Sequence, residues 1–269
     1  MSYSDHLRSL FPGLSLQVED LLLLETFQVK NLPARAPARE LATLIRTHPM
    51  VHRFLLAKHP PIKSFLDKIL DAHTPASDPQ LIRDHCQEAL WEVADLIIYN
   101  KHPEMFDQNA PIRWEPDEIS SICTLEGKVA ADVGAGTGRI AFQLVPLVQT
   151  MYAVEPVTAL RTFMKEKAQR EHTDNLFVMD GTLDAIPLPD DSLDILITSN
   201  AIAWNLEDEL REIERVVKPG GCAIHLLFSD LQHETPYHEI LTSPSWNYQH
   251  TQIQSENKLK IRYYKTIPR

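Results

Sequence analysis

The chain has 269 residues, 43% of them hydrophobic and 23% charged, which suits one large α/β domain and a smaller unit. Its 37 Asp and Glu outnumber its 26 Lys and Arg, giving a formal charge of −11. Because phosphate backbones are bound by basic patches, this charge disfavours a nucleic-acid partner. No apolar run approaches the ~20 residues of a membrane span and no secretory signal is recognisable, so we expect a soluble, cytoplasmic protein.

The first 115 residues predict an all-helical domain. Apolar residues recur there at helical spacing, and prolines divide the region into short segments. We expect a helix capped by Ser15 and carrying residues 16–24, a helix at Ala38–Thr47, a long helix at Pro79–Tyr99, and a linker without clear period at Asn100–Glu115. The domain prediction is therefore a helical lid or substrate-selecting domain at 1–115, followed by a second domain at 116–269.

Neither the histidines nor the cysteines predict a metal site. His48 and His52 are four residues apart, a spacing that places two side chains on one helix face, and His59 follows. Pro49 disturbs that helical turn, however, and no carboxylate or cysteine completes a coordination set. The three cysteines are odd in number and far apart, which predicts reduced thiols (Cys86, Cys123 and Cys222).

After residue 125, short apolar runs alternate with helical patterns, which is typical of parallel βαβ units. We predict strands at Lys128–Val133, Met151–Val154, Leu176–Met179, Leu193–Thr198 and Cys222–Phe228, helices at Val157–Glu171 and Leu206–Val217, and two closing strands at Asn247–Ile253 and Leu259–Thr266. Pro219-Gly220-Gly221 is expected to end the second helix and turn the chain into the fifth strand. The register of the closing strands cannot be read from the sequence.

The stretch VAADVGAGTGRI, from Val129 to Ile140, predicts a strand, a tight glycine turn and a helix. Such a turn leaves the strand end open to a nucleoside-type ligand. The dinucleotide pattern G-x-G-x-x-G would need glycine at position 139, where the sequence has Arg139, so an NAD-dependent oxidoreductase is disfavoured. Asp132 lies just before the turn, where its charge opposes a pyrophosphate and suits a sulfonium. This favours S-adenosylmethionine.

Two further carboxylates follow at the ends of the next two predicted strands. In an open parallel sheet the ligand binds at the carboxyl ends of the strands. Glu155 is placed there to accept hydrogen bonds from both ribose hydroxyls, and Asp180 to accept from the exocyclic amine of adenine. Each acid taken alone favours a turn residue or a helix cap. Three strand-end acids beside a glycine turn together indicate a nucleoside site.

These residues resemble the class I S-adenosylmethionine-dependent methyltransferases, especially their small-molecule "type 11" branch. The resemblance covers about residues 122–228 and rests on ADVGAGTG, AVEP, MDGTLDAIPLPDDSLDILITSNAIAW and EIERVVKPGG. It implies a Rossmann-like, doubly wound, mostly parallel sheet of about seven strands, with S-adenosyl-L-methionine as the cofactor. The cofactor-binding residues that it implies are Asp132, Gly134, Ala135, Gly136, Thr137, Gly138, Glu155, Pro156, Asp180, Gly181, Thr182, Asn200, Ala201 and Trp204.

The resemblance implies in-line methyl transfer to a small or medium-sized acceptor. Two alternatives stay open: a protein or tRNA methyltransferase, and a non-catalytic S-adenosylmethionine-binding interaction protein. The polar candidates for a general base are Tyr99, His102, Asn200 and His225, and none is assigned, because the first two can end a helix and His225 lies in mid-strand. The acceptor, the role of the helical region and the oligomeric state are not readable from the sequence.

Overall fold

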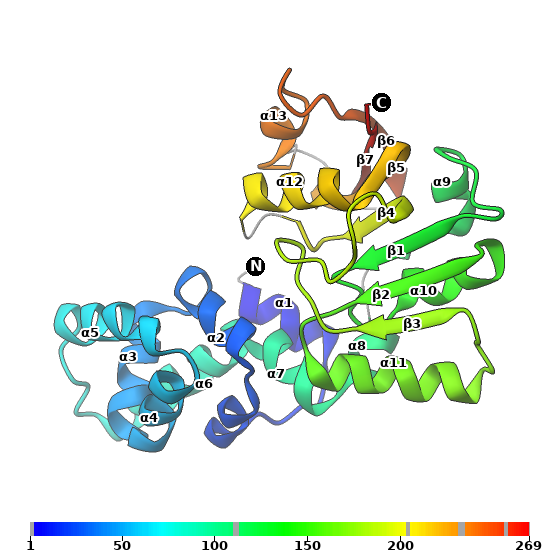
Figure 1. The fold of residues 1–269 in the computed structure, drawn as a ribbon. Coiled ribbons are helices and arrows are strands. Elements are labelled where there is room, and N and C mark those ends of the chain that lie inside the picture. The colour runs from blue at the N-terminus through cyan, green and yellow to red at the C-terminus, as the bar shows by residue number, and fades with distance from the viewer. Residues whose placement is uncertain (1–2, 110–112, 203–204, 231–234, 256–257, 269) are drawn as a thin grey trace. The chain divides into compact units, whose positions relative to one another are not determined.

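A computed structural model describes residues 3–109, 113–202, 205–230, 235–255 and 258–268. The chain divides into two compact units, Met1–Pro111 and Ile112–Arg269. The first unit is helical and the second is built on a sheet (Figure 1). Within the described residues, no helix combines the length and apolar character needed to cross a membrane.

Short helices packed around one apolar core make up the first unit. Fully buried leucines and isoleucines, among them Leu44, Leu55, Leu90 and Ile97, fill this core. Prolines occupy the first position of several helices, where the missing N–H has no partner to lose. The elements are α1 (Tyr3–Leu10), η1 (Val18–Leu23), α2 (Thr26–Asn31), η2 (Leu32–Ala34), α3 (Ala38–Thr47), α4 (Pro49–Lys58), η3 (Pro60–Ile62), α5 (Lys63–Ala72), α6 (Pro79–Glu92), α7 (Ala94–Lys101) and α8 (Pro103–Asn109).

Two expectations for this unit are wrong. The long helix expected at Pro79–Tyr99 is broken at Val93, whose φ of −120° and ψ of 19° are not helical. The break places Asp95 in the first turn of α7, where Arg35 donates to both of its carboxylate oxygens at 2.8 and 2.9 Å. The leucine-rich segment expected to form a helix from Ser15 is instead the shorter 3₁₀ helix η1, which begins with the Gln17 N–H donating to Asp20 at 2.8 Å and ends at the extended Leu24.

The segment expected to be an irregular linker contains α8. Pro103 begins this helix, and the ring of Phe106 packs edge-on against Tyr99 with centroids 4.6 Å apart. Phe106 and Met105 both pack against the core of the first unit. Seven residues give too little periodicity for a sequence pattern, and tertiary packing stabilises the helix instead.

The second unit contains a seven-stranded sheet in the order β3-β2-β1-β4-β5-β7-β6 (Figure 1). Its strands are β1 (Val129–Val133), β2 (Thr150–Val154), β3 (Leu176–Met179), β4 (Leu193–Ser199), β5 (Val217–Asp230), β6 (Gln249–Ser255) and β7 (Lys258–Thr266). The first five run parallel, whereas β7 is antiparallel to both β5 and β6. The expected doubly wound, mostly parallel sheet is confirmed.

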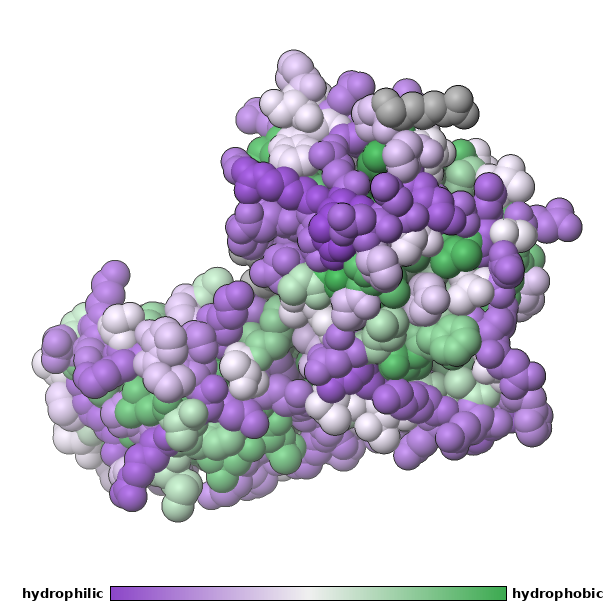
Figure 2. Space-filling view, viewed as in Figure 1, coloured by the Kyte–Doolittle hydropathy of each residue, from purple (hydrophilic) through white to green (hydrophobic). Residues whose placement is uncertain are grey.

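Helices cover both faces of this sheet, as side-chain alternation along the strands requires. On β1, Ala131 belongs to the core that α12 covers with Leu210, whereas the neighbouring Ala130 belongs to the core that α10 covers with Leu144. The outer surfaces of α11 and α12 are hydrophilic (Figure 2). The helical elements are α9 (Pro116–Ser120), α10 (Arg139–Leu144), η4 (Val145–Leu147), α11 (Thr158–Arg170), α12 (Leu206–Val216) and α13 (His238–Leu241).

We expected Pro219-Gly220-Gly221 to separate α12 from β5, and this expectation is wrong. The helix ends at Val216 and the strand begins at once with Val217, so the three residues lie inside β5. Pairing with β4 shifts there from Leu193↔Val217 to Ile195↔Cys222. Gly220, with φ at +84°, makes this bulge, and its N–H donates to the Ile267 carbonyl at 2.8 Å.

Candidate cofactor and acceptor site

The glycine loop leaves the end of β1 and begins α10. Gly134, Gly136 and Gly138 all have positive φ, and Gly138 is the N-cap of the helix. The N–H groups of Gly134 and Ala135 both donate to the Val154 carbonyl at the end of β2, at 2.8 and 3.1 Å. The loop is thereby fixed against the ends of two neighbouring strands.

Close packing joins this loop to the segment that follows β4. A Cβ atom on Gly134 would lie 2.2 Å from the Cβ of Ala201, so only glycine fits. The order of the strands reverses between β1 and β4, and such a switch point is where open α/β sheets bind ligands. Asn200, next to Ala201, holds a left-handed conformation with φ at +53°, and its N–H donates to the Leu226 carbonyl on β5.

Asp132 lies on β1, two residues before the loop, and is 1% exposed. Its Oδ2 accepts from the Ala141 N–H of α10 at 3.2 Å. Burial raises the pKa of this carboxyl to about 7, against the opposing effects of that hydrogen bond and of the Arg139 charge. The side chain therefore joins β1 to the first turn of α10 and places a buried titratable carboxyl near the start of the loop.

Glu155 follows β2 directly and is 5% exposed. Its two carboxylate oxygens accept separately, Oε1 from the Val157 N–H at 2.9 Å and Oε2 from the Gly136 N–H at 2.8 Å. Burial raises its pKa to about 7, although those hydrogen bonds and the nearby Arg161 oppose the rise. The carboxylate thus joins the glycine loop to the start of α11 and retains lone pairs for further donors.

Asp180 lies one residue beyond β3, and its side chain is 73% exposed. Arg161 of α11 donates from Nη1 to Asp180 Oδ1 at 2.9 Å and to the Glu155 carbonyl at 2.8 Å. A Cβ atom on the following Gly181 would lie 2.6 Å from Pro187, so the chain passes there at close quarters. Thr182 donates to Asp184 at 2.5 Å. Glu155 and Asp180 therefore lie at successive strand ends and are connected through one arginine.

Three other residues expected at the site are Thr137, Pro156 and Trp204. Thr137, in the glycine loop, is 1% exposed, and its hydroxyl has no hydrogen-bond partner among the described residues. Pro156 lies between Glu155 and the start of α11. Trp204 lies outside the described residues.

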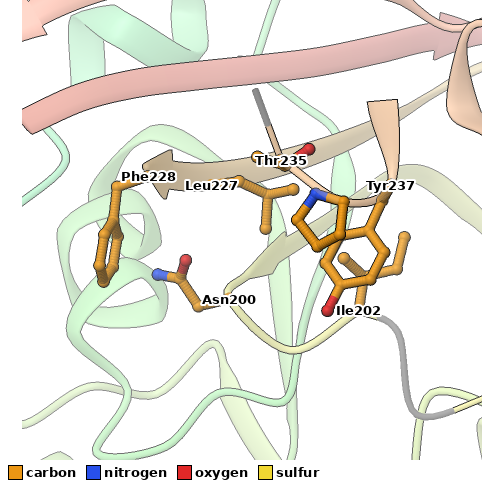
Figure 3. Close-up of a pocket in the computed structure, with 7 residues that line it drawn as sticks. Asn200, Ile202, Leu227, Phe228, Thr235 and Tyr237 are labelled. Atoms are coloured by element: carbon orange, nitrogen blue, oxygen red, sulfur yellow. The ribbon is translucent and has the colours of Figure 1, made fainter. Parts of the chain in front are cut away.

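A cavity of about 260 Å³ adjoins the segment after β4. Phe228 lies on one side of Asn200 and Tyr237 on the other, and Leu227 lies between them (Figure 3). The lining combines apolar side chains with an amide and a phenol, and its residues are Asn200, Ile202, Leu227, Phe228, Thr235, Pro236 and Tyr237. Such a lining suits a partly apolar small molecule that also forms hydrogen bonds.

Of the remaining candidates for a general base, His225 belongs to the second unit, and His102 and Tyr99 belong to the first. His225 is completely buried in mid-strand, where its Nδ1 is 2.9 Å from the Thr198 hydroxyl and burial lowers its pKa to about 3. His102 ends α7 and Tyr99 packs against Phe106, both in the first unit. No set of three or more His, Cys, Asp or Glu among the described residues is arranged to hold a metal ion. All three cysteines are free.

Sequence reasoning missed Arg161 and the cavity residues of the C-terminal segment. Arg161 follows Glu155 by six residues, and this spacing places it in the first turn of the next helix. The sequence therefore contained a signal that Arg161 lies near the end of β2. Thr235 and Tyr237 belong to no motif, and they reach the site only through the antiparallel end of the sheet.

Comparisons with known proteins agree with this geometry. Residues 131–225 match the family model of a methyltransferase domain. An uncharacterized methyltransferase, YcgJ of Bacillus subtilis, is 34% identical over 131 residues, which cover 46% of this chain and 51% of that protein. The malonyl-[acyl-carrier protein] O-methyltransferase of Yersinia pestis is 33% identical over 107 residues, 39% of this chain and 37% of that protein. The chain thus spans about half the length of YcgJ and less of the second relative.

A solved structure gives the same result for the fold. The S-adenosylmethionine-dependent methyltransferase of Aquifex aeolicus superposes with a TM-score of 0.50 and 18% sequence identity, covering 60% of this chain and 97% of that one. The region matched by the family model, residues 131–225, contains the glycine loop and the three strand-end acids. Residues 131–225 are therefore a methyltransferase domain, and the Ile112–Arg269 unit that contains them has the fold of an S-adenosylmethionine-dependent methyltransferase.

Proposed function

We propose that this chain transfers the methyl group of S-adenosylmethionine to a small or medium-sized acceptor. The observation that carries the proposal is the convergence, at the reversal of strand order, of the glycine loop and the acids that follow β2 and β3. In this assignment Glu155 accepts from the ribose hydroxyls, Asp180 accepts from the adenine amine, and the glycine loop contacts the methionine portion.

The residues present fit such a ligand. The buried Thr137 hydroxyl has an unused hydrogen-bonding capacity in the loop, which a polar group of the methionine portion would satisfy. Each Glu155 oxygen has accepted only one backbone N–H, and a carboxylate has about four lone-pair sites. Two ribose hydroxyls can therefore be bound without displacing the contacts that hold the loop.

The sulfonium supplies an activated methyl group, so the protein mainly has to orient the reactants and exclude water. Asn200 and Ile202 lie both after β4 and in the cavity lining, so this segment links the two parts of the site. The cavity of about 260 Å³ lies just below the range of roughly 300–1,000 Å³ typical of small-molecule sites, which favours a small acceptor. The helical unit lies outside the region that matches the family model, and its role as a lid stays a prediction.

Titration calorimetry with S-adenosylhomocysteine tests the cofactor half of the proposal. We expect binding by the wild type and a loss of at least about tenfold in affinity for Glu155→Gln, which exchanges an acceptor oxygen for a donor. Glu166→Gln, an exposed change on α11, is the matched control and should bind as the wild type does. Absence of binding by the wild type at high micromolar concentrations would refute the proposal.

Transfer from labelled S-adenosylmethionine to a panel of acceptors tests the other half. The panel should include malonyl-acyl carrier protein, because a relative is named for that acceptor. Ile202→Trp fills the cavity and should abolish transfer while S-adenosylhomocysteine still binds, whereas Ile240→Trp on the exposed side of α13 should change neither. Transfer that survives in Ile202→Trp would place the acceptor elsewhere.

A further inference from the structure

Arg161 connects the ends of two strands that each carry a proposed nucleoside-binding acid. It lies in the first turn of α11, and its side chain is 13% exposed. Nη1 donates to the Glu155 carbonyl and to Asp180 Oδ1, at 2.8 and 2.9 Å, and Nη2 donates to the Thr158 hydroxyl at 3.0 Å. One planar guanidinium therefore fixes the end of β2, the residue after β3 and the start of α11 relative to one another.

The contact with Arg161 matters most for Asp180, because it is the hydrogen bond that orients this exposed side chain. Its side chain is 73% exposed, and an exposed aspartate without a fixed partner samples several rotamers. Arg161 is largely buried and itself held at two other points, so its ion pair with Asp180 is better ordered than a pair of two mobile surface side chains. Arg161 engages Oδ1, which leaves Oδ2 to accept from a ligand.

We propose that Arg161 is a positioning residue that sets nucleobase specificity by holding Asp180 toward the exocyclic amine of adenine. The inference rests on the proposed function, because it takes Glu155 and Asp180 as the nucleoside-binding acids. Adenine presents an amine at this position and hypoxanthine presents a carbonyl oxygen, which a fixed carboxylate repels. Without Arg161, the Asp180 carboxylate can rotate away from the base, and the chain then discriminates less between adenine and hypoxanthine.

The test compares the binding of S-adenosylhomocysteine with that of S-inosylhomocysteine, in which an oxygen replaces the amine. Calorimetry on the full chain should show that the wild type prefers the adenine ligand by about 10- to 100-fold, the range of one hydrogen bond to a charged group. Arg161→Gln should reduce this preference to about threefold or less, and Arg161→Lys should keep part of it. Arg170→Gln, an exposed change on the same helix, should leave it unchanged.

A double-mutant cycle separates positioning from a general structural effect. If Arg161 acts through Asp180, then Asp180→Asn removes the same preference, and adding Arg161→Gln to that variant reduces it no further. Should Arg161→Gln fail to fold, Thr158→Ala removes only one support of the guanidinium and should give a smaller drop. The inference is overturned if folded Arg161→Gln keeps the wild-type preference for S-adenosylhomocysteine over S-inosylhomocysteine. If Arg161→Gln does not fold, the same result in Thr158→Ala overturns it. It is also overturned if the effects of Arg161→Gln and Asp180→Asn on this preference simply add in the double variant. No binding of S-adenosylhomocysteine by the wild type refutes the proposed function instead.

Discussion

Replacing Gly134 by alanine perturbs the contact between the glycine loop and the segment after β4. With φ at +74°, an alanine in this left-handed conformation costs about 1–2 kcal/mol. Its Cβ would also lie 2.2 Å from the Cβ of Ala201, and relieving such an overlap typically costs about 1–3 kcal/mol. We therefore expect Gly134→Ala to lower the free energy of unfolding by roughly 2–5 kcal/mol, the sum of the two effects.

The two parts of this effect can be measured separately by urea unfolding. Gly127→Ala is the matched control, since Gly127 has φ at +70° and no atom within 4 Å of the added Cβ, so only the backbone cost of about 1–2 kcal/mol remains. Ala201→Gly should rescue the steric part, because the next atom, Ala201 Cα, is 3.7 Å away. If Gly134→Ala is no more destabilising than Gly127→Ala, or Ala201→Gly rescues nothing, the reasoning about this contact is refuted.

Three further predictions concern buried polar groups. The pKa of Asp132 is about 7 in the folded chain against an ordinary value of 3.8, so the folded state binds this proton more tightly than the unfolded state does. As the pH rises from about 4 to about 7, the free energy of unfolding should therefore fall, by about 4 kcal/mol at most. Urea unfolding of Asp132→Asn should show a flatter pH dependence, and an unchanged slope would contradict the assignment. Tyr263→Phe removes a buried hydroxyl that is 3.1 Å from Thr235 Oγ1 and 3.0 Å from His238 Nδ1, and calorimetric melting should show a loss of about 1–3 kcal/mol. Arg35→Met leaves the buried Asp95 without its main partner and should destabilise the first unit by about 3–5 kcal/mol, which the fluorescence of Trp91 can follow during urea unfolding. Lys63→Met, at an exposed pair of the same unit, should change the free energy of unfolding by less than about 1 kcal/mol.

The sequence predicts well those helices and strands whose ends are marked by a change in the local pattern of apolar and polar residues. The ranges predicted for β3 and α3 agree with the structure at both ends, and β1, β2 and β4 agree within one residue. The break at Val93 could not be predicted, because the apolar repeat runs through it unchanged. It is coupled to a contact made by Asp95 with Arg35, 60 residues away in the chain. Periodicity reports which face is buried and carries no information about such distant partners.

For the site too, local sequence predicts some residues, whereas others depend on contacts between distant parts of the chain. The sequence predicts the positions of Glu155 and Asp180 at the ends of β2 and β3, because each follows a recognisable strand, and the carboxyl ends of parallel strands share one edge of the sheet. The connection through Arg161 and the cavity beside Asn200 depend instead on the side-chain directions and on the antiparallel pairing of β5 with β7. In that pairing His225 lies opposite Tyr263, whose hydroxyl is hydrogen-bonded to Thr235 in the cavity wall. Nothing in the local sequence specifies this register.

The hydrogen bonds of the loop also explain why it suits a sulfonium nucleoside better than a dinucleotide. An anion-binding loop directs free N–H groups at a pyrophosphate. Here the Gly136 N–H is donated to Glu155, and those of Gly134 and Ala135 are donated to the Val154 carbonyl. Burial raises the pKa values of Asp132 and Glu155 to about 7, so both carboxyls gain by ionising beside a cation and lose by approaching an anion. The affinity for S-adenosylmethionine relative to its neutral product should therefore rise between pH 6 and pH 8, and titration of both ligands across that range would show it.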